Sequence, residues 1–320
     1  MTNSFPNLNF NRRRRGPLPI VIGILVVASI ALVSLSGFYA DWLWFKSVDF
    51  TEVWSTILLT KAAVFIVAGL ATSLIITLNV YIAFRKRPLY VPQSIEADNL
   101  ERYRAQIEPI RRLVLVGLSL VLFYFGGSSA SQLWDTWLLF RNSTSFGVTD
   151  PQFGLDISFF AFKLPMYQAF VAWGISTLIF AIIGSAIVHY LYGGIRPQVP
   201  QERTTVAARV QLSVLLGLVV LLKAAAYWLD RYALALKDNK LITGLTYTDV
   251  NALLPAKAIL TGIAVICSLL FFANIVRKSW LLPAAGTALL VISSVLIAGI
   301  YPAAIQQFQV KPSESSKEAP

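Results

Sequence analysis

Long runs of apolar residues, separated by short polar segments, dominate the chain. Seven of these runs approach or exceed the roughly 20 residues that an α-helix needs to cross the hydrocarbon core of a bilayer. The second and third runs are longer than that, so we expect these two helices to tilt or to extend beyond the bilayer. The pattern predicts an all-α, polytopic membrane helix bundle with about seven transmembrane helices, at residues 17–38, 54–84, 112–140, 165–192, 209–233, 256–276 and 280–301.

Composition agrees with a membrane protein. Hydrophobic residues make up 56% of the 320 residues and charged residues only 13%, whereas a soluble protein has about 25% charged residues. The chain has one histidine, His189, and one cysteine, Cys267, which excludes metal sites built from clusters of these residues. We therefore expect no metal and no cofactor, and the sequence holds neither a glycine-rich phosphate loop nor a Ser/His/Asp catalytic set.

The distribution of Lys and Arg predicts the orientation in the membrane. With the N-terminus in the cytoplasm, sixteen basic residues fall in inner segments and nine in outer segments, while Lys61 and Lys223 lie within apolar runs. Because basic residues concentrate in cytoplasmic loops, this split predicts an N-in/C-out topology in a bacterial plasma membrane. The net charge of +11 then reflects topology, and the expected partner is the lipid bilayer, with no nucleic acid.

The segments outside the apolar runs have distinct characters. Within the inner loop, apolar residues from Leu100 to Ile110 recur at steps of three and four, which indicates a short amphipathic helix with Ser94 as its N-cap. We expect four parts beyond the helices: a disordered basic cytoplasmic tail at 1–16, the inner amphipathic loop at 85–111, an outer lid at 141–164, and at 302–320 an extracytoplasmic linker or the start of a soluble domain.

The lid is rich in phenylalanine but is interrupted by turn-forming residues. Asp150 precedes Pro151, which favours a turn, and Gly154 permits a second bend. Asp156 can then cap a short helical turn, which carries Phe159, Phe160 and Phe162. The two aspartates either cap turns or line a polar entrance that could bind a cation, although two separated carboxylates are a weak calcium signal. We predict a lid at the outer interface that does not cross the membrane.

Five polar residues are expected within or near the membrane: Lys61, Asp135, Lys223, Tyr227 and Asp230. The last three share one helical face, and all five lie at similar depth in the outer half. An ionisable group in a membrane span is a functional candidate. Either the lysines extend to the interface or form structural ion pairs, or the group lines a polar cavity open to the outside. A cavity predicts a lysine amine within salt-bridge reach of Asp135 or Asp230.

Four stretches together resemble a known family. They are YADWLWFKSVDFTEVW (39–54), FGVTDPQFGLDISFFAFKLP (146–165), YTDVNALLPAKAIL (247–260) and YPAAIQQFQVKPSESSKEAP (301–320). They are similar to the N-terminal membrane region of uncharacterised protein family 0182, large multi-pass membrane proteins of actinobacteria and cyanobacteria. The resemblance implies a bundle of about seven helices followed by a large extracytoplasmic domain. It implies no activity.

Three functions remain open on the sequence. The first is a membrane anchor and docking platform for an extracytoplasmic domain in envelope biology, with envelope proteins or lipids as partners at the outer face. The second is a transporter or channel with an outward-facing polar site, and the third is a membrane enzyme that acts on a lipid-linked substrate. A polar track through both halves of the membrane would favour transport. The inner halves look apolar apart from Asn79 and His189, which favours the platform.

Overall fold

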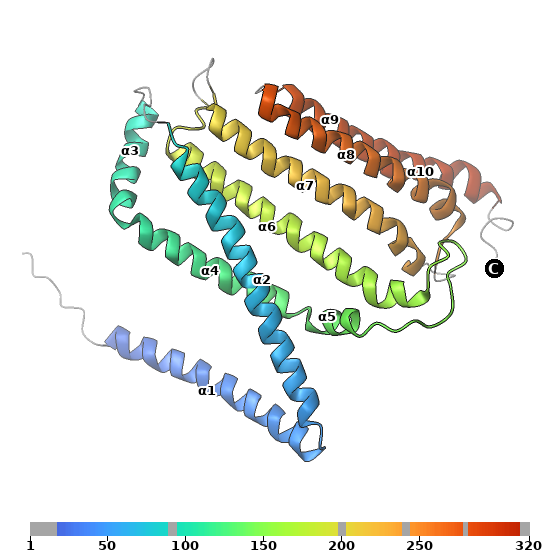
Figure 1. Cartoon of the computed structure of the whole chain (residues 1–320), viewed down its shortest axis with the longest axis horizontal. Coiled ribbons are helices and arrows are strands. Elements are labelled where there is room, and N and C mark those ends of the chain that lie inside the picture. Colours follow the sequence, from blue (N-terminus) through green and yellow to red (C-terminus); the bar gives the residue numbers. More distant parts are fainter. Residues whose placement is uncertain (1–17, 89–94, 198–202, 239–243, 278–280, 314–320) are drawn as a thin grey trace, which may run out of the picture. The chain divides into compact units, whose positions relative to one another are not determined.

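The structure, a computed structural model, describes residues 18–88, 95–197, 203–238, 244–277 and 281–313. Every regular element in these ranges is helical, and two isolated antiparallel bridges join Thr149 to Asp156 and Ile195 to Thr204. Figure 1 labels the α-helices α1 Leu18–Ser47, α2 Thr51–Arg85, α3 Ile95–Ile107, α4 Arg111–Ser131, α5 Trp134–Arg141, α6 Leu164–Leu191, α7 Val206–Ala233, α8 Leu254–Arg277, α9 Leu281–Val295 and α10 Tyr301–Ile305.

Shorter helical segments extend several of these helices. Four are π-helical turns, and three are 3₁₀ turns. The π turns are η2 Phe159–Lys163, η4 Asp249–Leu253, η5 Leu296–Ile300 and η6 Gln306–Val310, and the 3₁₀ turns are η1 Glu108–Ile110, η3 Leu234–Leu236 and η7 Lys311–Ser313.

The predicted all-α fold is confirmed. Six helical stretches of the described chain are long and apolar enough to cross a membrane: Thr51–Arg85, Leu100–Ser131, Phe159–Leu191, Val206–Leu236, Asp249–Arg277 and Leu281–Ser313. The first predicted span, at 17–38, is also helical, since it lies almost entirely within the 30-residue helix α1. These lengths and compositions are typical of a multi-pass membrane protein.

The chain divides into two compact units, Met1–Leu59 and Thr60–Pro320. In the first unit, α1 turns into α2 through Asp49, whose φ of 60° is a left-handed conformation that aspartate tolerates. The amide of Phe50 donates to the carbonyl of Phe45 at 2.9 Å and closes this turn. Beside it, the rings of Phe38 and Trp54 pack edge to face at 5.0 Å.

In the second unit, α6, α7, α8 and α9 contact one another in chain order (Figure 1). Helix α7 lies between two apolar clusters, and each of its two faces contributes residues to one of them. One cluster joins Val220 and Tyr227 of α7 to α8 residues such as Phe271. The other joins Leu215 of α7 to Ile76 of α2 and to α6. Burial on both faces fixes the rotation of α7, and with it the direction of its polar side chains.

Helices α2 and α4 approach closely through glycines. A Cβ at Gly69 would lie 2.6 Å from the carbonyl oxygen of Phe123, and one at Gly127 would lie 2.6 Å from that of Phe65. Small residues permit this approach between membrane helices. The hydroxyls of Ser73 and Ser119 lie 2.7 Å apart in the same contact, so hydrogen bonding adds to the packing.

The structure differs from the predicted spans at two places. The span expected at 112–140 is broken between α4 and α5, where Gln132 and Leu133 donate to carbonyls three residues earlier. A run of glycine and serine precedes the break, and these residues favour α-helix poorly. The segment from residue 302, expected to be a linker or the start of a soluble domain, is helical to Ser313, and Pro302 directly follows the π turn η5, where the regular α-helical hydrogen bonding is already interrupted. The tail at 1–16, Ser94 and 314–320 lie outside the described residues.

Candidate functional site

Polar side chains of α7, α8 and α9 meet in one cluster at the C-terminal end of α7. The amine of Lys257 lies 2.8 Å from the carboxylate of Asp230. The hydroxyl of Tyr227 lies 3.3 Å from that of Ser294, and the amine of Lys223 lies 4.7 Å from the centre of the Tyr227 ring. The cluster therefore gathers three of the residues singled out in the sequence and adds Lys257 and Ser294.

The pairing of Lys61 or Lys223 with Asp135 or Asp230, which a polar cavity would require, is absent from the described chain. Neither amine lies within 4.0 Å of a carboxylate of the described chain, and Lys61 instead lies 5.3 Å from the ring of Trp134. Asp135 accepts the amide of its neighbour Thr136 at 2.7 Å. Depth along a helix can be counted from sequence, but the rotation that decides which side chains meet cannot. Lys257, at the start of the span expected at 256–276, was missed for the same reason.

A second ion pair lies beside this cluster. Asp249, the first residue of η4, is fully buried and accepts the amine of Lys237 at 3.0 Å. Its other oxygen accepts the amide and hydroxyl of Thr246, at 3.0 and 2.8 Å. One residue earlier, the hydroxyl of Thr248 donates to the side-chain carbonyl of Gln306 in η6. These contacts tie the loop after α7 and the start of α8 to the end of the last helix.

The lid folds on its two aspartates. Asp150 accepts the amides of Gln152 and Phe153 at 3.0 and 2.7 Å, and its own amide and carbonyl bond to Leu155 and Gly154. Gly154 has φ of +65°, a region that glycine enters without strain. The turn expected at Asp150 and Pro151 is thus present, with the carboxylate used to close it.

Asp156 is the other organising residue of the lid. It accepts the hydroxyl of Ser145 at 2.5 Å and the amides of Phe146, Gly147 and Ser158 at 2.8 to 3.2 Å. These bonds, with that from Ser145 the largest cause, hold the pKa of Asp156 well below its ordinary range, because they favour the ionised form. Both carboxylates therefore close turns through backbone amides, and the geometry gives no sign of a cation site.

The lid phenylalanines pack on α6 and also on α7. Phe160 is 4% exposed, and Phe159 lies 5.4 Å from the ring of Tyr232 and 6.5 Å from that of Tyr167. Phe153 packs against Tyr232 as well, with tilted rings whose centres lie 5.0 Å apart. We expected contacts with the ends of spans three and four. The segment η2 does contact α5 and α6, and Tyr232 of α7 is an additional partner that the sequence did not indicate.

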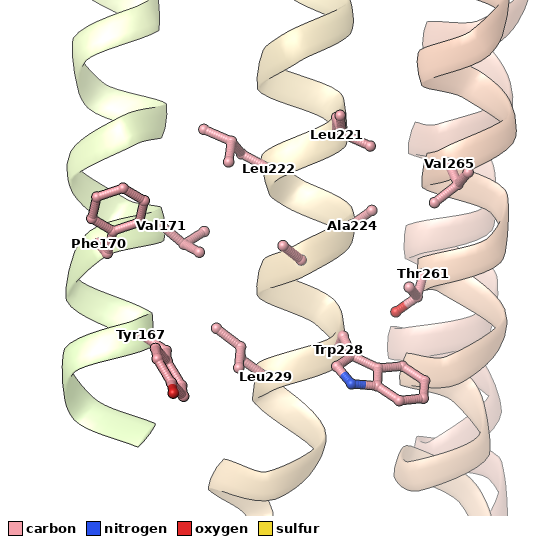
Figure 2. A pocket seen from close by; sticks show the side chains of 11 residues that line it. Tyr167, Phe170, Val171, Leu221, Leu222, Ala224, Trp228, Leu229, Thr261 and Val265 are labelled. Atoms are coloured by element: carbon pink, nitrogen blue, oxygen red, sulfur yellow. The ribbon is translucent and has the colours of Figure 1, made fainter. Parts of the chain in front are cut away.

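An apolar groove crosses α7 between α6 and α8, close to the cluster that contains Asp230 and Lys257 (Figure 2). Its volume is about 450 Å³, and side chains from all three helices line it, among them Tyr167, Phe170, Leu222, Ala225, Trp228 and Val265. Alanines of α7 form part of its lining, and their short side chains leave the space. The sequence shows these residues only as part of apolar runs.

A neutral polar network lies at the opposite ends of the helices. The side-chain amide of Gln211 in α7 donates to the backbone carbonyl of Asn79 at 2.8 Å, and lies 3.3 Å from the hydroxyl of Ser185. Its carbonyl oxygen lies 3.0 Å from Nε2 of His189, which therefore carries the proton. The network joins α2, α6 and α7. The sequence pointed to Asn79 and His189 and missed Gln211.

Further polar contacts join α7 to α8 at this level. Asn274 donates to the hydroxyl of Ser213 at 2.6 Å, and Ser268 donates to the carbonyl of Gly217 at 2.9 Å. The expectation of an apolar inner half was therefore wrong. Gln211 and Asn274 are amides inside otherwise apolar runs, and this feature alone could have identified them. Among the side chains that the structure describes, no group of three His, Cys, Asp or Glu residues could hold a metal ion.

Comparison with known sequences identifies the family. The profile of the Uncharacterised protein family (UPF0182) matches residues 18–320. The chain belongs to UPF0182. A UPF0182 protein of Streptomyces coelicolor is 47% identical over 96% of the chain and 31% of its own length. Another, of a Nocardioides species, is 47% identical over 98% of the chain and 31% of its own length.

The UPF0182 relatives are much longer than this chain, which spans about a third of their length. The resemblance seen in the four sequence stretches is confirmed by these matches. No solved structure matches the chain. Three of the four stretches contribute to the sites described above: the lid aspartates come from the second, Asp249 and Lys257 from the third, and Gln306 from the last.

Proposed function

We propose that this membrane region of UPF0182 anchors and positions an extracytoplasmic part of the protein in the plasma membrane. One observation carries the proposal: the C-terminal end of α7, the start of α8 and η6 are fastened together by polar contacts. These are the ion pairs Lys257–Asp230 and Lys237–Asp249 and the bond from Thr248 to Gln306. In the proposed N-in/C-out topology, all of them lie on the outer side.

Fixed outer ends suit a platform better than a simple tether. Val310, four residues beyond Gln306, is fully buried, so the last helix remains packed beyond the span that the sequence predicted at 280–301. Asp249 is also fully buried, whereas its partner Lys237 is 43% exposed, so loss of the carboxylate should cost about 3 kcal/mol, the lower limit for a buried ion pair. Contacts of this strength fix the position of these segments, and therefore the direction in which the chain that follows them leaves the membrane region. Chain length agrees, since two thirds of each relative lies outside the matched part.

The topology is tested by reporter fusion. A reporter that is active only outside the cytoplasm, fused after Pro320, should be active, and the same reporter inserted after Lys86 should be silent. A cytoplasmic reporter should give the reverse pattern. If the fusion after Pro320 works only with the cytoplasmic reporter, the anchor faces the wrong way and the proposal fails.

Docking is tested in the full-length Streptomyces coelicolor relative. A specific protease site is placed directly after the residue that aligns with Ser313, and the purified protein is cleaved in mild detergent. A platform predicts that the released part still co-elutes with the membrane part on a sizing column. Separate elution at moderate salt would show a tether without docking.

Transport is the second candidate, and the neutral network supports it. Polar groups are present in the half of the bundle that the sequence suggested was apolar. They come from Gln211, Asn79, Ser185 and His189. Together with the outer cluster they give polarity at two levels. Proteoliposomes that contain a pH-sensitive dye, driven by a potassium potential, would show proton flux in the wild type and less flux in Gln211→Leu. Equal leakage in both, matching empty vesicles, would reject proton transport.

A further inference from the structure

The groove across α7 has a length that fits one leaflet of a bilayer. Its α7 residues run from Leu221 to Leu229, which is about 12 Å at 1.5 Å per residue. Half of a hydrocarbon core is about 15 Å. Its volume of about 450 Å³ lies within the roughly 300–1,000 Å³ range of ligand pockets. Leu221 and Phe170 are 41% and 60% exposed, so the groove opens sideways to the lipid.

The lining of the groove is apolar, and the polar tips of three of its residues lie toward one end (Figure 2). Figure 2 shows the indole nitrogen of Trp228, the hydroxyl of Tyr167 and the hydroxyl of Thr261 at the same end, while the side chains at the other end are hydrocarbon. Thr261 uses its hydroxyl to bond the carbonyl of Lys257 at 2.9 Å. Trp and Tyr with an apolar body and a polar tip are typical of the membrane–water boundary.

A cation without a carboxylate partner lies at this polar end. Arg231, one helical turn beyond Trp228, places its guanidinium carbon 4.3 Å from the Trp228 ring centre. Its Nε is buried and has no hydrogen-bond partner among the described residues. No carboxylate of the described chain lies within 4.0 Å of it, and neighbouring Asp230 pairs with Lys257 instead. The guanidinium thus retains donors and a full positive charge.

We infer that the groove binds one glycerophospholipid, with an acyl chain along α7 and the phosphate at Arg231. Arginine suits this role because its planar fork donates two hydrogen bonds to a phosphate. The apolar groove gives the chain a place, the aromatic tips mark the boundary, and the unpaired guanidinium supplies the complementary charge. In the proposed topology the lipid belongs to the outer leaflet. The inference does not depend on the platform, because the groove lies within the membrane region alone.

Native mass spectrometry tests the inference on the whole chain released from detergent after incubation with phosphatidylglycerol. The wild type should retain one lipid, and Arg231→Gln should retain about tenfold less, as expected for loss of a charge-assisted bidentate contact. Ala225→Trp, which fills the groove, should also lose the lipid. Arg277→Gln and Ala273→Trp change exposed residues of α8 and are matched controls that should retain it.

Two competitors separate the sources of the signal. Diacylglycerol with the same chains should be retained much less than phosphatidylglycerol, and millimolar inorganic phosphate should not displace the bound lipid. Equal retention by the wild type and Arg231→Gln would overturn the phosphate contact. Retention in Ala225→Trp would overturn the acyl site, and displacement by free phosphate would show an anion site without a lipid. Circular dichroism of each variant distinguishes lost binding from lost folding.

Discussion

Both ends of α7 carry polar side chains among apolar ones, but the two ends provide partners for these side chains with different chemistry. At one end, Gln211 joins neutral groups of α2 and α6 through hydrogen bonds. At the other, Asp230, Lys257 and the neighbouring Asp249 form charged pairs. A neutral amide in hydrocarbon needs partners for a few donors and acceptors, whereas an ionised group also needs a countercharge. Each of the two carboxylates, Asp230 and Asp249, accordingly has a lysine as its countercharge.

This contrast teaches where substitutions should matter. The neutral end depends on one central residue that contacts several helices, so its loss removes several weak bonds together. The charged end depends on separate pairs, and the effect of each follows from burial. Asp249 is fully buried, whereas the side chain of Asp230 is 36% exposed. The four predictions below test this order.

The largest effect is expected for Asp249→Ala. The change removes three contacts to a fully buried carboxylate, and the free energy of unfolding should fall by about 3 kcal/mol. Thermal unfolding in detergent, followed by tryptophan fluorescence, measures the loss. Asp238→Ala changes an exposed aspartate nearby and should shift stability by no more than about 0.5 kcal/mol. Equal effects of the two substitutions would contradict the importance assigned to Asp249.

Gln211→Leu should have the next largest effect. Hydrogen bonds between membrane helices contribute about 0.6 kcal/mol each on average, so the loss of three gives about 2 kcal/mol. Gln307→Leu is the matched control, because Gln307 is exposed and bonds only Lys311 among the contacts described. A stable Gln211→Leu protein would show that the neutral network packs equally well without its amide.

Lys257→Met and Lys223→Met form a matched pair on the charged end. Lys257→Met leaves the partly exposed Asp230 unpaired and should cost about 1 kcal/mol after allowance for solvent. Lys223→Met removes a cation–π contact at an exposed site, worth about 0.5 kcal/mol. The same unfolding assay compares them. A larger loss for Lys223→Met would mean that Lys223 has a charged partner that the structure does not place.

The smallest effect is local, at Asp156. A carboxylate with a lowered folded-state pKa contributes stability that is complete above its unfolded-state pKa, about 3.9, and is lost as pH falls through the folded-state pKa. The lid should therefore remain ordered from pH 7 to pH 4 and loosen only at stronger acid. Hydrogen exchange of the Gly147 and Ser158 amides, corrected for intrinsic rates, follows this. In Asp156→Asn the lid's response to acid should disappear. Loosening already near pH 5 would contradict the assignment.

Much of the fold could be predicted because it depends on one-dimensional properties. Apolar run length gives the helices, and Asp150–Pro151 and Gly154 give the turns of the lid through local backbone preference. The break at Gln132 was missed because seven polar or small residues were read as part of a long apolar run. Lys257 and Gln211 were missed as partners because contacts between helices depend on rotation about the helix axis. That rotation is set by packing on both faces of α7, which no single run of sequence reports.

The π turn η5 sets the direction in which the end of the chain faces. A π turn contains one residue more than an α turn, and each residue of an α-helix advances the side-chain direction by about 100°. The wider π turn takes up this extra residue, so the case to consider is that in which all five residues Leu296–Ile300 adopt the α geometry. Everything after them would then turn by about a quarter of a circle, and Gln306 would face away from Thr248. The π turn thus keeps the end of the last helix in phase with the start of α8.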